Sequence, residues 1–204
     1  MRVTEDRYIR DLRQIHLAQR MVRNQLRTQS ISAWTGLTGN QVRNLCRSLG
    51  PGASFMSRHR GPPPTRLTRF LQSPTLRSEA SALAAVATVL GVIPAHPVPD
   101  PERSLPGIER GEKLCQTFEL FKRLVPESNI SMDQFTLLVL RLAKGEDLQV
   151  VHCLACHAAL LVDPLSNKPR QCIRCCNAPV EPTEMKVDSA GRHALGDRAP
   201  RGGV

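Results

Sequence analysis

The sequence predicts a mainly α-helical protein, with a helix-turn-helix-like segment near the N-terminus and a small C-terminal subdomain organised by four cysteines. Three observations lead to this prediction. Apolar residues recur three and four positions apart over much of the chain, which is the spacing of an amphipathic helix. Aromatic residues make up only 3% of the chain, so aliphatic side chains must fill the core, and this composition favours helices over sheets. After residue 148 the spacing gives way to short apolar runs around cysteine pairs.

Changes in composition divide the chain into five predicted segments. An N-terminal, Arg-rich helical segment covers 1–56, and a Pro-rich linker covers 57–75. The helical core is predicted over 76–148, and the cysteine-containing subdomain over 149–182. The tail, 183–204, has too few apolar residues to bury and is expected to be disordered.

Helices are predicted within these segments from apolar spacing, caps and stop residues. The first carries apolar residues that should share one buried face: Tyr8, Ile9, Leu12, Ile15, Ala18, Met21, Val22 and Leu26. The predicted helical ranges are 4–28, a pair within 30–49, 76–90, 112–124 and 131–143. The insert at 94–111 is dense in proline and charge, so it is expected to loop out from the core.

Positive charge is concentrated at the N-terminal end of the chain. The net charge is +10, and the first 78 residues hold fourteen arginines, no lysine and only three acidic residues. Arginine binds phosphate through a planar fork and can pair bidentately with guanine, so this distribution points to nucleic acid. The alternative is a solvated basic face, or a codon bias that favours arginine.

The chain shows no feature of a secreted or membrane-spanning protein. No apolar run follows the N-terminal charges, and the longest apolar candidate, 80–93, contains Ser81 and Thr88. We therefore expect a cytoplasmic protein with no membrane partner. In that compartment, clustered cysteines bind metal more often than they form structural disulfides.

Residues 30–47 have the layout of a helix-turn-helix. Ile31 and Trp34 would be core residues of a short helix, Gly36 would form the turn, and Thr38 would cap a second helix. The outward side chains of that second helix are ones that pair with base edges in the major groove: Asn40, Gln41, Arg43, Asn44 and Arg47. Arg58 and Arg60 are further candidate DNA contacts. The alternative interpretation of residues 30–47 is a helical bundle without any nucleic-acid role.

Two cysteine pairs carry the most specific motif of the chain. Cys153, Cys156, Cys172 and Cys175 follow the pattern C-x2-C-x15-C-x2-C, the spacing of a structural zinc site of the zinc-ribbon type. Four thiolates close a tetrahedron around one ion and leave no position for a catalytic water, so one structural zinc ion is predicted.

Other interpretations of the cysteine motif remain open. Cys176 is the first candidate to replace a ligand, and the neighbouring histidines are interpreted as bystanders. A redox switch that releases zinc on oxidation is the rival interpretation. Zinc-dependent base deamination is excluded, because it requires a Pro before a cysteine pair. Cys46 and Cys115 fall on apolar helix faces and are predicted to be core thiols.

Taken in order, these motifs resemble one family, the FlhC subunit of the bacterial flagellar master regulator. The resemblance covers roughly 10–182, and it lies in the Arg43 to Gly50 run, the prolines at 62–64, the segment 137–151 and the cysteine order. It implies a helical fold with a zinc-bound C-terminal subdomain and the four cysteines as ligands. It also implies a hetero-oligomer with an FlhD-like companion subunit that activates flagellar-type promoters through RNA polymerase. The chain departs from the family in its longer, proline-rich insert and in its tail.

The function predicted from these features is a DNA-binding transcriptional activator, not an enzyme. No Gly-rich phosphate loop or nucleophile motif is present in the sequence, and the acidic residues are scattered. A second DNA contact through Lys168, Arg170 and Arg174 is also expected. The alternatives are a zinc-stabilised protein-interaction module and a zinc-dependent RNA-binding regulator, neither with sequence-specific DNA binding.

Overall fold

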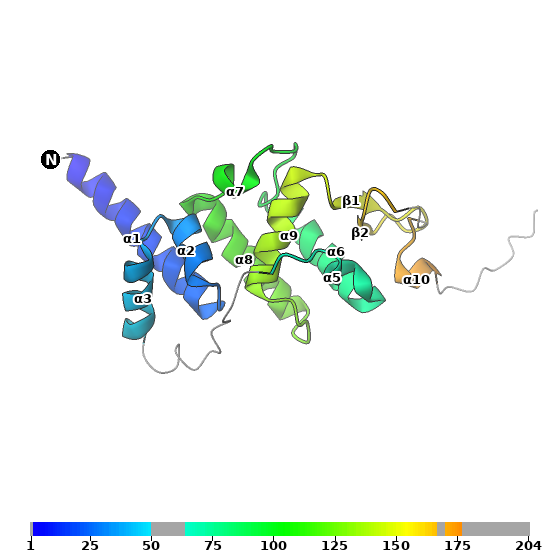
Figure 1. Ribbon diagram of the computed structural model, residues 1–204, viewed down its shortest axis with the longest axis horizontal. Helices are drawn as coiled ribbons and strands as arrows, with labels where there is room; N and C mark the ends of the chain where they lie inside the picture. The colour runs from blue at the N-terminus through cyan, green and yellow to red at the C-terminus, as the bar shows by residue number, and fades with distance from the viewer. Residues whose placement is uncertain (1, 50–63, 167–169, 177–204) are drawn as a thin grey trace, which may run out of the picture.

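The chain folds into a mainly helical structure with one small hairpin, seen in the computed structural model (Figure 1). This structure describes residues 2–49, 64–166 and 170–176. The helices are α1 (Arg2–Arg23), α2 (Thr28–Thr35), α3 (Gly39–Ser48), α5 (Arg69–Gln72), α6 (Pro74–Val89), α7 (Pro101–Ser104), α8 (Ile108–Leu124), α9 (Met132–Lys144) and α10 (Ile173–Cys176). The strands β1 (Gln149–His152) and β2 (Ala159–Val162) pair antiparallel, with His152 opposite Ala159.

Helices α6, α8 and α9 form the centre of the core. Leu83, Leu114, Phe121 and Leu138 are almost completely buried there, and the rings of Phe118 and Phe135 stack with centroids 6.0 Å apart. Burying side chains of this size is the main term that stabilises the fold. Mainly helical architecture is therefore confirmed, with aliphatic residues and phenylalanines filling the interior.

Local capping residues explain where several helices begin and end. Ser131 and Gln134 form a reciprocal capping box at the start of α9, and Gly145 ends that helix with φ 76°. At α6, the Ser73 hydroxyl accepts the N–H of Leu76, and Pro74 occupies the first turn, where its missing N–H costs nothing. These boundaries lie within two residues of the predicted ones.

The prediction that residues 94–111 loop out from the core is wrong. Pro101 and Leu105 are buried, the short helix α7 packs against α9, and the N–H of Val98 donates to the Ala143 carbonyl at 2.8 Å. Helix α8 also begins at Ile108, inside the predicted insert. Pro101 fits here because it begins α7, where a missing N–H costs nothing, so a proline-rich composition did not mean a solvated loop.

The long N-terminal helix also differs from its prediction. It ends at Arg23, because Gln25 adopts a left-handed backbone with φ 61°, which no helix can continue through. Ala18, Met21, Val22 and Leu26 are buried as expected, whereas Tyr8, Ile9, Leu12 and Ile15 are exposed. Figure 1 shows the first half of α1 projecting from one end of the molecule, while the hairpin lies at the other end.

Four of the five predicted segments lie partly or wholly outside the described residues, and only 76–148 is described throughout. The disordered tail, 183–204, lies outside them, as do 57–63 of the predicted linker. The rest of that linker contains helix α5, where Phe70 is 1% exposed, so this part belongs to the packed body. No helix within the described ranges is long and apolar enough to cross a membrane.

Candidate metal centre and nucleic-acid interface

The hairpin turn positions the first cysteine pair. Strand β1 leads directly into Cys153, whose N–H donates to the Ala158 carbonyl at 2.8 Å. The N–H of His157 donates back to the Cys153 carbonyl at 2.9 Å, and His157 takes a left-handed backbone with φ 57°. This tight turn holds the side chains of Cys153 and Cys156 on the same side.

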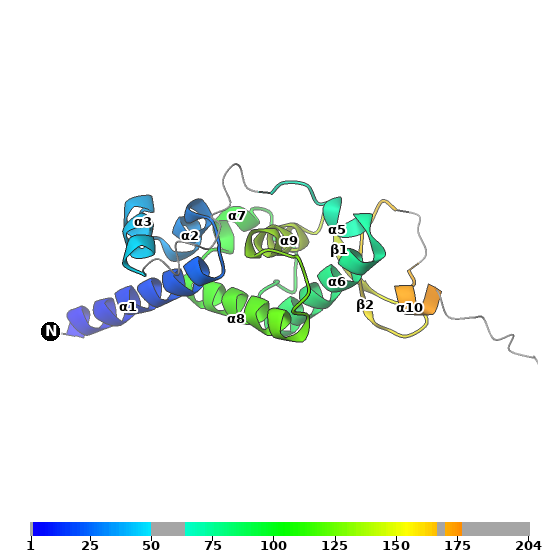
Figure 2. The same cartoon turned by 90° about the horizontal axis from the view of Figure 1, so that it is seen from below.

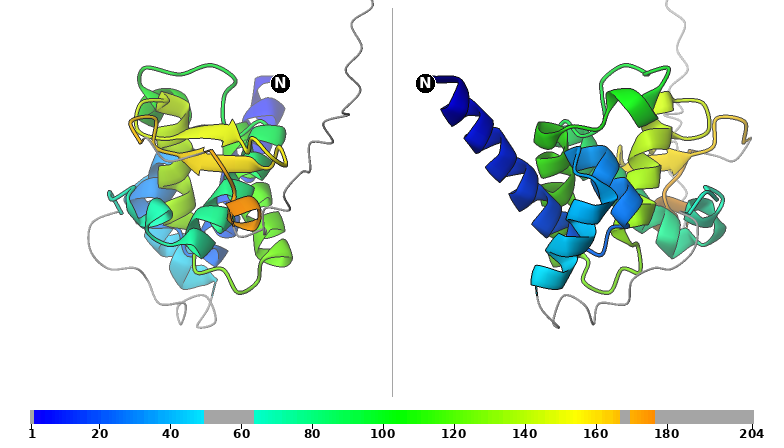
Figure 3. Two further views of the ribbon diagram at one scale, coloured as in Figure 1. Left: turned by 90° about the vertical axis from the view of Figure 1, so that its right-hand side faces the viewer. Right: turned by 60° about the vertical axis from the view of Figure 1, so that its left-hand side comes forward.

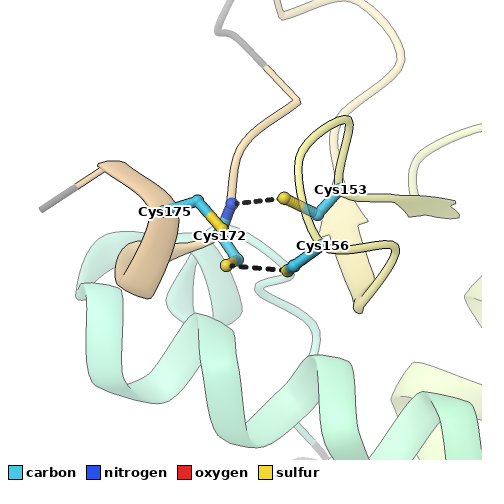
Figure 4. Close-up of side chains that lie close together, drawn as sticks. All are labelled: Cys153, Cys156, Cys172 and Cys175. Carbon is cyan, nitrogen blue, oxygen red and sulfur yellow. Dashed lines mark hydrogen bonds between the residues drawn. The ribbon is translucent and has the colours of Figure 1, made fainter. Parts of the chain in front are cut away.

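The second cysteine pair lies at the start of α10. Cys172 precedes this helix and its carbonyl accepts the N–H of Cys176 at 2.9 Å, so Cys172 and Cys175 are one helical turn apart. The two pairs are joined through the backbone, because the N–H of Leu154 donates to the Arg170 carbonyl at 3.0 Å. Figure 4 shows all four side chains pointing toward one another.

The four sulfur atoms form a cluster that could hold one metal ion. They all lie within 4.8 Å of one another, and the sulfurs of Cys156 and Cys172 are 3.5 Å apart. Thiolates at the usual zinc–sulfur distance in a tetrahedron would be roughly 3.8 Å apart, so the cluster needs little adjustment to close on an ion. The residues present therefore fit a four-thiolate metal site.

Hydrogen bonds favour the thiolate form at part of this cluster. Backbone N–H groups of Cys156 and Cys172 lower the pKa of the Cys153 thiol to about 6, and the N–H of Cys172 lies 3.4 Å from its sulfur. The backbone N–H of Cys175 likewise lowers the pKa of Cys172. In contrast, hydrogen bonds to the sulfurs of Cys156 and Cys172 raise the pKa of Cys175. A bound cation would reverse that last effect, because it favours deprotonation of every coordinating thiol.

The neighbouring residues that could replace a metal ligand make other contacts. Cys176 is exposed and its thiol lies 3.6 Å from the Gln171 side-chain oxygen. His152 contacts the carbonyl of His157 through Nδ1 at 3.1 Å. Neither residue belongs to the four-sulfur group found within the described residues.

Helix α6 anchors the hairpin to the body. The N–H of Leu161 donates to the Ser81 hydroxyl at 2.8 Å, and that hydroxyl donates to the Arg77 carbonyl. Arg77 returns its Nε–H to the Leu161 carbonyl at 3.0 Å. Sequence inspection missed this attachment, because nothing local to Ser81 or Arg77 indicates a partner about eighty residues away. The cysteine cluster is consequently fixed relative to α6 (Figure 3).

Helices α2 and α3 are joined by a short turn that two residues specify. Gly36 ends α2 with φ 77°, a left-handed conformation that glycine adopts without strain. Thr38 caps α3, since its hydroxyl accepts the N–H of Gln41 while the Gln41 side chain accepts the N–H of Thr38 at 2.8 Å. Trp34 is 3% exposed and is a core residue, as expected. The T-x-x-Q spacing carried this capping signal in the sequence.

The predicted DNA-contact residues of α3 are all exposed, but they differ in what holds them. Gln41 is engaged in the cap. Arg43 donates to the Asn40 side chain, and Arg47 donates to the Asn44 side chain at 3.0 Å, so each arginine is oriented along the outer face. Val42 and Cys46 are buried on the opposite face.

The other predicted DNA contacts lie either outside the described residues or far from α3. Arg58, Arg60 and Lys168 lie outside the described residues. Arg170 and Arg174 are exposed beside the cysteine cluster, far along the molecule from α3 (Figure 1).

Cys115 is a core thiol as predicted, and burial raises its pKa to about 12.

Comparison with known proteins adds no relative. No protein-family model matches the chain, and no curated protein matches it at a significant level. The α2–α3 pair and the cysteine cluster are the two features of the molecule that bear on its function.

Proposed function

We propose that this protein is a DNA-binding transcriptional activator that uses α3 as its recognition helix and one structural zinc ion to organise its C-terminal end. The observation that carries this proposal is the two-sided character of α3. One face is buried through Val42 and Cys46, while the other displays Asn40, Arg43 and Asn44 to solvent.

The side-chain chemistry of this outer face suits duplex DNA. Arginine pairs bidentately with guanine, and asparagine with adenine, across the major groove. Helix α3 has 10 residues, and its length of roughly 15 Å fits a groove about 12 Å wide. Helix α2 packs against α3. In this proposal the pair would act as the two helices of a helix-turn-helix, and arginines of the N-terminal half would contact phosphates.

Zinc is the metal that the cysteine cluster fits best. Four thiolate donors in a closed tetrahedral set select zinc among the common divalent ions, and they leave no open position for substrate. When bound, the ion would supply cross-linking and no chemistry. Cys153 and Cys156 would hold it from the hairpin, and Cys172 and Cys175 from the start of α10.

The resemblance to the FlhC family supports the biological part of the proposal. It supports action in a hetero-oligomer with an FlhD-like companion subunit, at flagellar-type promoters, with RNA polymerase as the downstream partner. A regulon other than the flagellar one is equally compatible with the two structural features, because neither the helix pair nor the cysteine cluster specifies a target gene.

The proposal is tested by DNA binding of the full chain and two variants. A preferred duplex is first selected from a random pool, and binding is then measured by fluorescence anisotropy on this duplex and on an unrelated one. We expect Arg43→Ala to weaken binding to the selected duplex by about 5-fold to 150-fold, and binding to the unrelated duplex much less. Arg103→Ala is the matched control, because Arg103 is 90% exposed on α7, away from α3.

Three outcomes contradict parts of the proposal. Equal losses on both duplexes would make Arg43 a phosphate contact. No affinity for any duplex at low salt would contradict DNA binding altogether, because phosphate contacts strengthen as salt falls. Preferential binding to double-stranded RNA would favour an RNA-binding regulator, since the A-form major groove does not admit α3.

A further inference from the structure

A polar cavity lies where the hairpin packs against α6. It has a volume of about 210 Å³, below the roughly 300 Å³ at which pockets for drug-sized ligands begin, so it suits a small ion. Figure 2 shows the hairpin beside α5 and α6, the elements that border the cavity. Polar side chains supply most of the lining: Arg77, Gln149, Asp163, Ser166 and Arg170.

Arg77 is held in place at one wall of the cavity. Its side chain is half-buried, and its Nε–H donates to the Leu161 carbonyl at 3.0 Å. A guanidinium has five N–H donors, and this hydrogen bond uses one of them. Within the described ranges, no ion pair or further hydrogen bond engages the others. A positioned cation with donors to spare therefore lines the cavity.

Arg170 brings a second guanidinium to the same cavity. Its backbone carbonyl accepts the N–H of Leu154 beside the cysteine cluster, so this part of the chain is fixed. Its side chain is exposed and forms no ion pair with any residue that the structure describes. Two cations that line one small cavity repel each other, and an anion between them would remove that repulsion.

One carboxylate opposes the two arginines. Asp163 is half-buried and also lines the cavity, and its Oδ1 accepts the N–H of Leu165 at 2.8 Å. It forms no ion pair with Arg77 or Arg170 in the described part of the chain. The lining therefore holds two positive charges and one negative charge, which leaves a positive charge to be balanced.

We propose that this cavity is a binding site for a phosphate group, held by the guanidinium groups of Arg77 and Arg170. Arginine binds phosphate bidentately through its planar fork, and such charge-assisted hydrogen bonds are stronger than neutral ones. Because Arg77 belongs to α6 and Arg170 precedes α10, a bound phosphate would tie the cysteine-containing end of the chain to the helical body.

This inference does not rest on DNA binding by α3, because neither arginine belongs to α2 or α3. It also separates Arg170 from Arg174, which is exposed on α10 but does not line the cavity. The phosphate group can come from free phosphate and small phosphorylated ligands, or from a DNA backbone. The experiment below distinguishes these two sources.

The test is a titration of the full-length protein with sodium phosphate, at an ionic strength held constant with sodium chloride. Backbone N–H resonances of Val162, Asp163 and Arg170 are followed by 15N NMR. We expect them to shift in a saturable way, with half-saturation at about 1 mM phosphate or below. The N–H resonance of Arg43, an exposed arginine on α3, should not saturate over the same range.

Three variants define the site. Arg170→Gln should weaken phosphate binding by at least about tenfold, because it removes charge-assisted hydrogen bonds and keeps the backbone contact to Leu154. Asp163→Asn should strengthen binding, because it removes the opposing charge and keeps an acceptor for the Leu165 N–H. Arg174→Gln is the matched control and should bind phosphate as the wild type does. Thermal unfolding without phosphate checks the folding of each variant.

The source of the phosphate is decided with a DNA duplex that lacks terminal phosphates. If Arg170→Gln loses inorganic phosphate but binds this duplex like the wild type, the site takes a small phosphate-bearing ligand. If both affinities fall in Arg170→Gln and neither falls in Arg174→Gln, the site takes a phosphate of the DNA backbone. A protein that binds phosphate but no duplex would contradict only the proposal of DNA binding.

Three results would overturn the inference. These are the absence of a saturable shift with phosphate, equal losses in Arg170→Gln and Arg174→Gln, which would indicate diffuse attraction to surface charge, and weaker binding in Asp163→Asn. If Arg170→Gln lowers the unfolding midpoint, Arg170→Lys takes its place, because it keeps the charge and loses the planar fork. Phosphate affinity equal to that of the wild type would then contradict the role of the Arg170 guanidinium.

Discussion

The two ends of this molecule are held in place by different kinds of interaction. At the C-terminal end, four thiols from a hairpin turn and a short helix converge within 4.8 Å. At the N-terminal end, α1 lies along α8 through the packing of Leu17 and Met21 on Gly111 and two arginine–glutamate pairs. The first attachment depends on one type of atom at fixed spacing, whereas the second depends on the shape of a whole helix face.

This difference determines how each attachment should fail. A cysteine cluster that binds one ion is all-or-none, because removing one thiolate opens the tetrahedron. A packed helix seam loses stability in increments as contacts are removed. Substitutions at the cysteine cluster should therefore abolish its attachment outright, whereas substitutions where α1 contacts α8 should lower stability by smaller, graded amounts.

The largest effect is expected at the cysteine cluster. With the proposed zinc ion at this cluster, Cys172→Ser or Cys153→Ser should lose the metal and unfold the hairpin and α10. The binding free energy of a structural zinc site, about 10–16 kcal/mol in small domains, is folding free energy. Native mass spectrometry measures the metal, and hydrogen exchange at Leu160 and Leu161 measures the hairpin. Cys176→Ser is the matched control and should keep one zinc per chain. A fully folded wild-type protein purified without metal would contradict this prediction.

A smaller, graded effect is expected where α1 contacts α8. A Cβ at Gly111 would lie 2.7 Å from Cδ2 of Leu17, so Gly111→Ala forces the buried Leu17 side chain or α1 itself to shift and should destabilise the protein by about 1–3 kcal/mol. Chemical denaturation measures this change. Gly107→Ala, four residues earlier, has no atom within 4 Å of the added Cβ and should change stability by less than about 0.5 kcal/mol. Equal effects of the two substitutions would show that the close approach is unimportant.

The smallest effect is expected at the ion pairs of the same seam. Burial raises the pKa of Glu119, but hydrogen bonds from Arg20 and Asn24 outweigh it, so the net shift is downward. Glu119→Gln should therefore cost about 1 kcal/mol at neutral pH. Because the folded pKa lies below the unfolded one, this contribution is present above the ordinary glutamate pKa and is lost as pH falls through the lowered value.

Denaturation of wild type and Glu119→Gln at matched pH values isolates this contribution, since any loss of metal in acid affects both proteins. Glu127→Gln, at an exposed glutamate after α8, should match the wild type throughout. A difference between wild type and Glu119→Gln that grows as the pH falls would contradict the assigned direction of the shift.

The same contrast explains which features were predictable from sequence. Ligand spacing is local, so C-x2-C pairs identified the cluster without knowledge of the fold. Caps are also local, and Ser131 with Gln134 and Thr38 with Gln41 placed two helix starts. Which end of α1 is buried was not predictable, because the apolar spacing continues unchanged from Tyr8 to Val22, and only the helices packed on the second half of α1 distinguish the two ends. The packing of Pro101 and Leu105, which belong to the insert itself, likewise depends on partners distant in sequence.

The separation of 99 residues between Arg13 and Glu112 also has a consequence for synthesis. At ribosomal rates of about 5–20 residues per second, α1 leaves the ribosome roughly 5–20 s before α8 does. During that interval the apolar side chains of Leu17 and Met21, which are buried against α8 in the folded protein, are exposed to solvent. The nascent chain therefore presents an apolar patch, the kind of surface that chaperones bind, until α8 covers it.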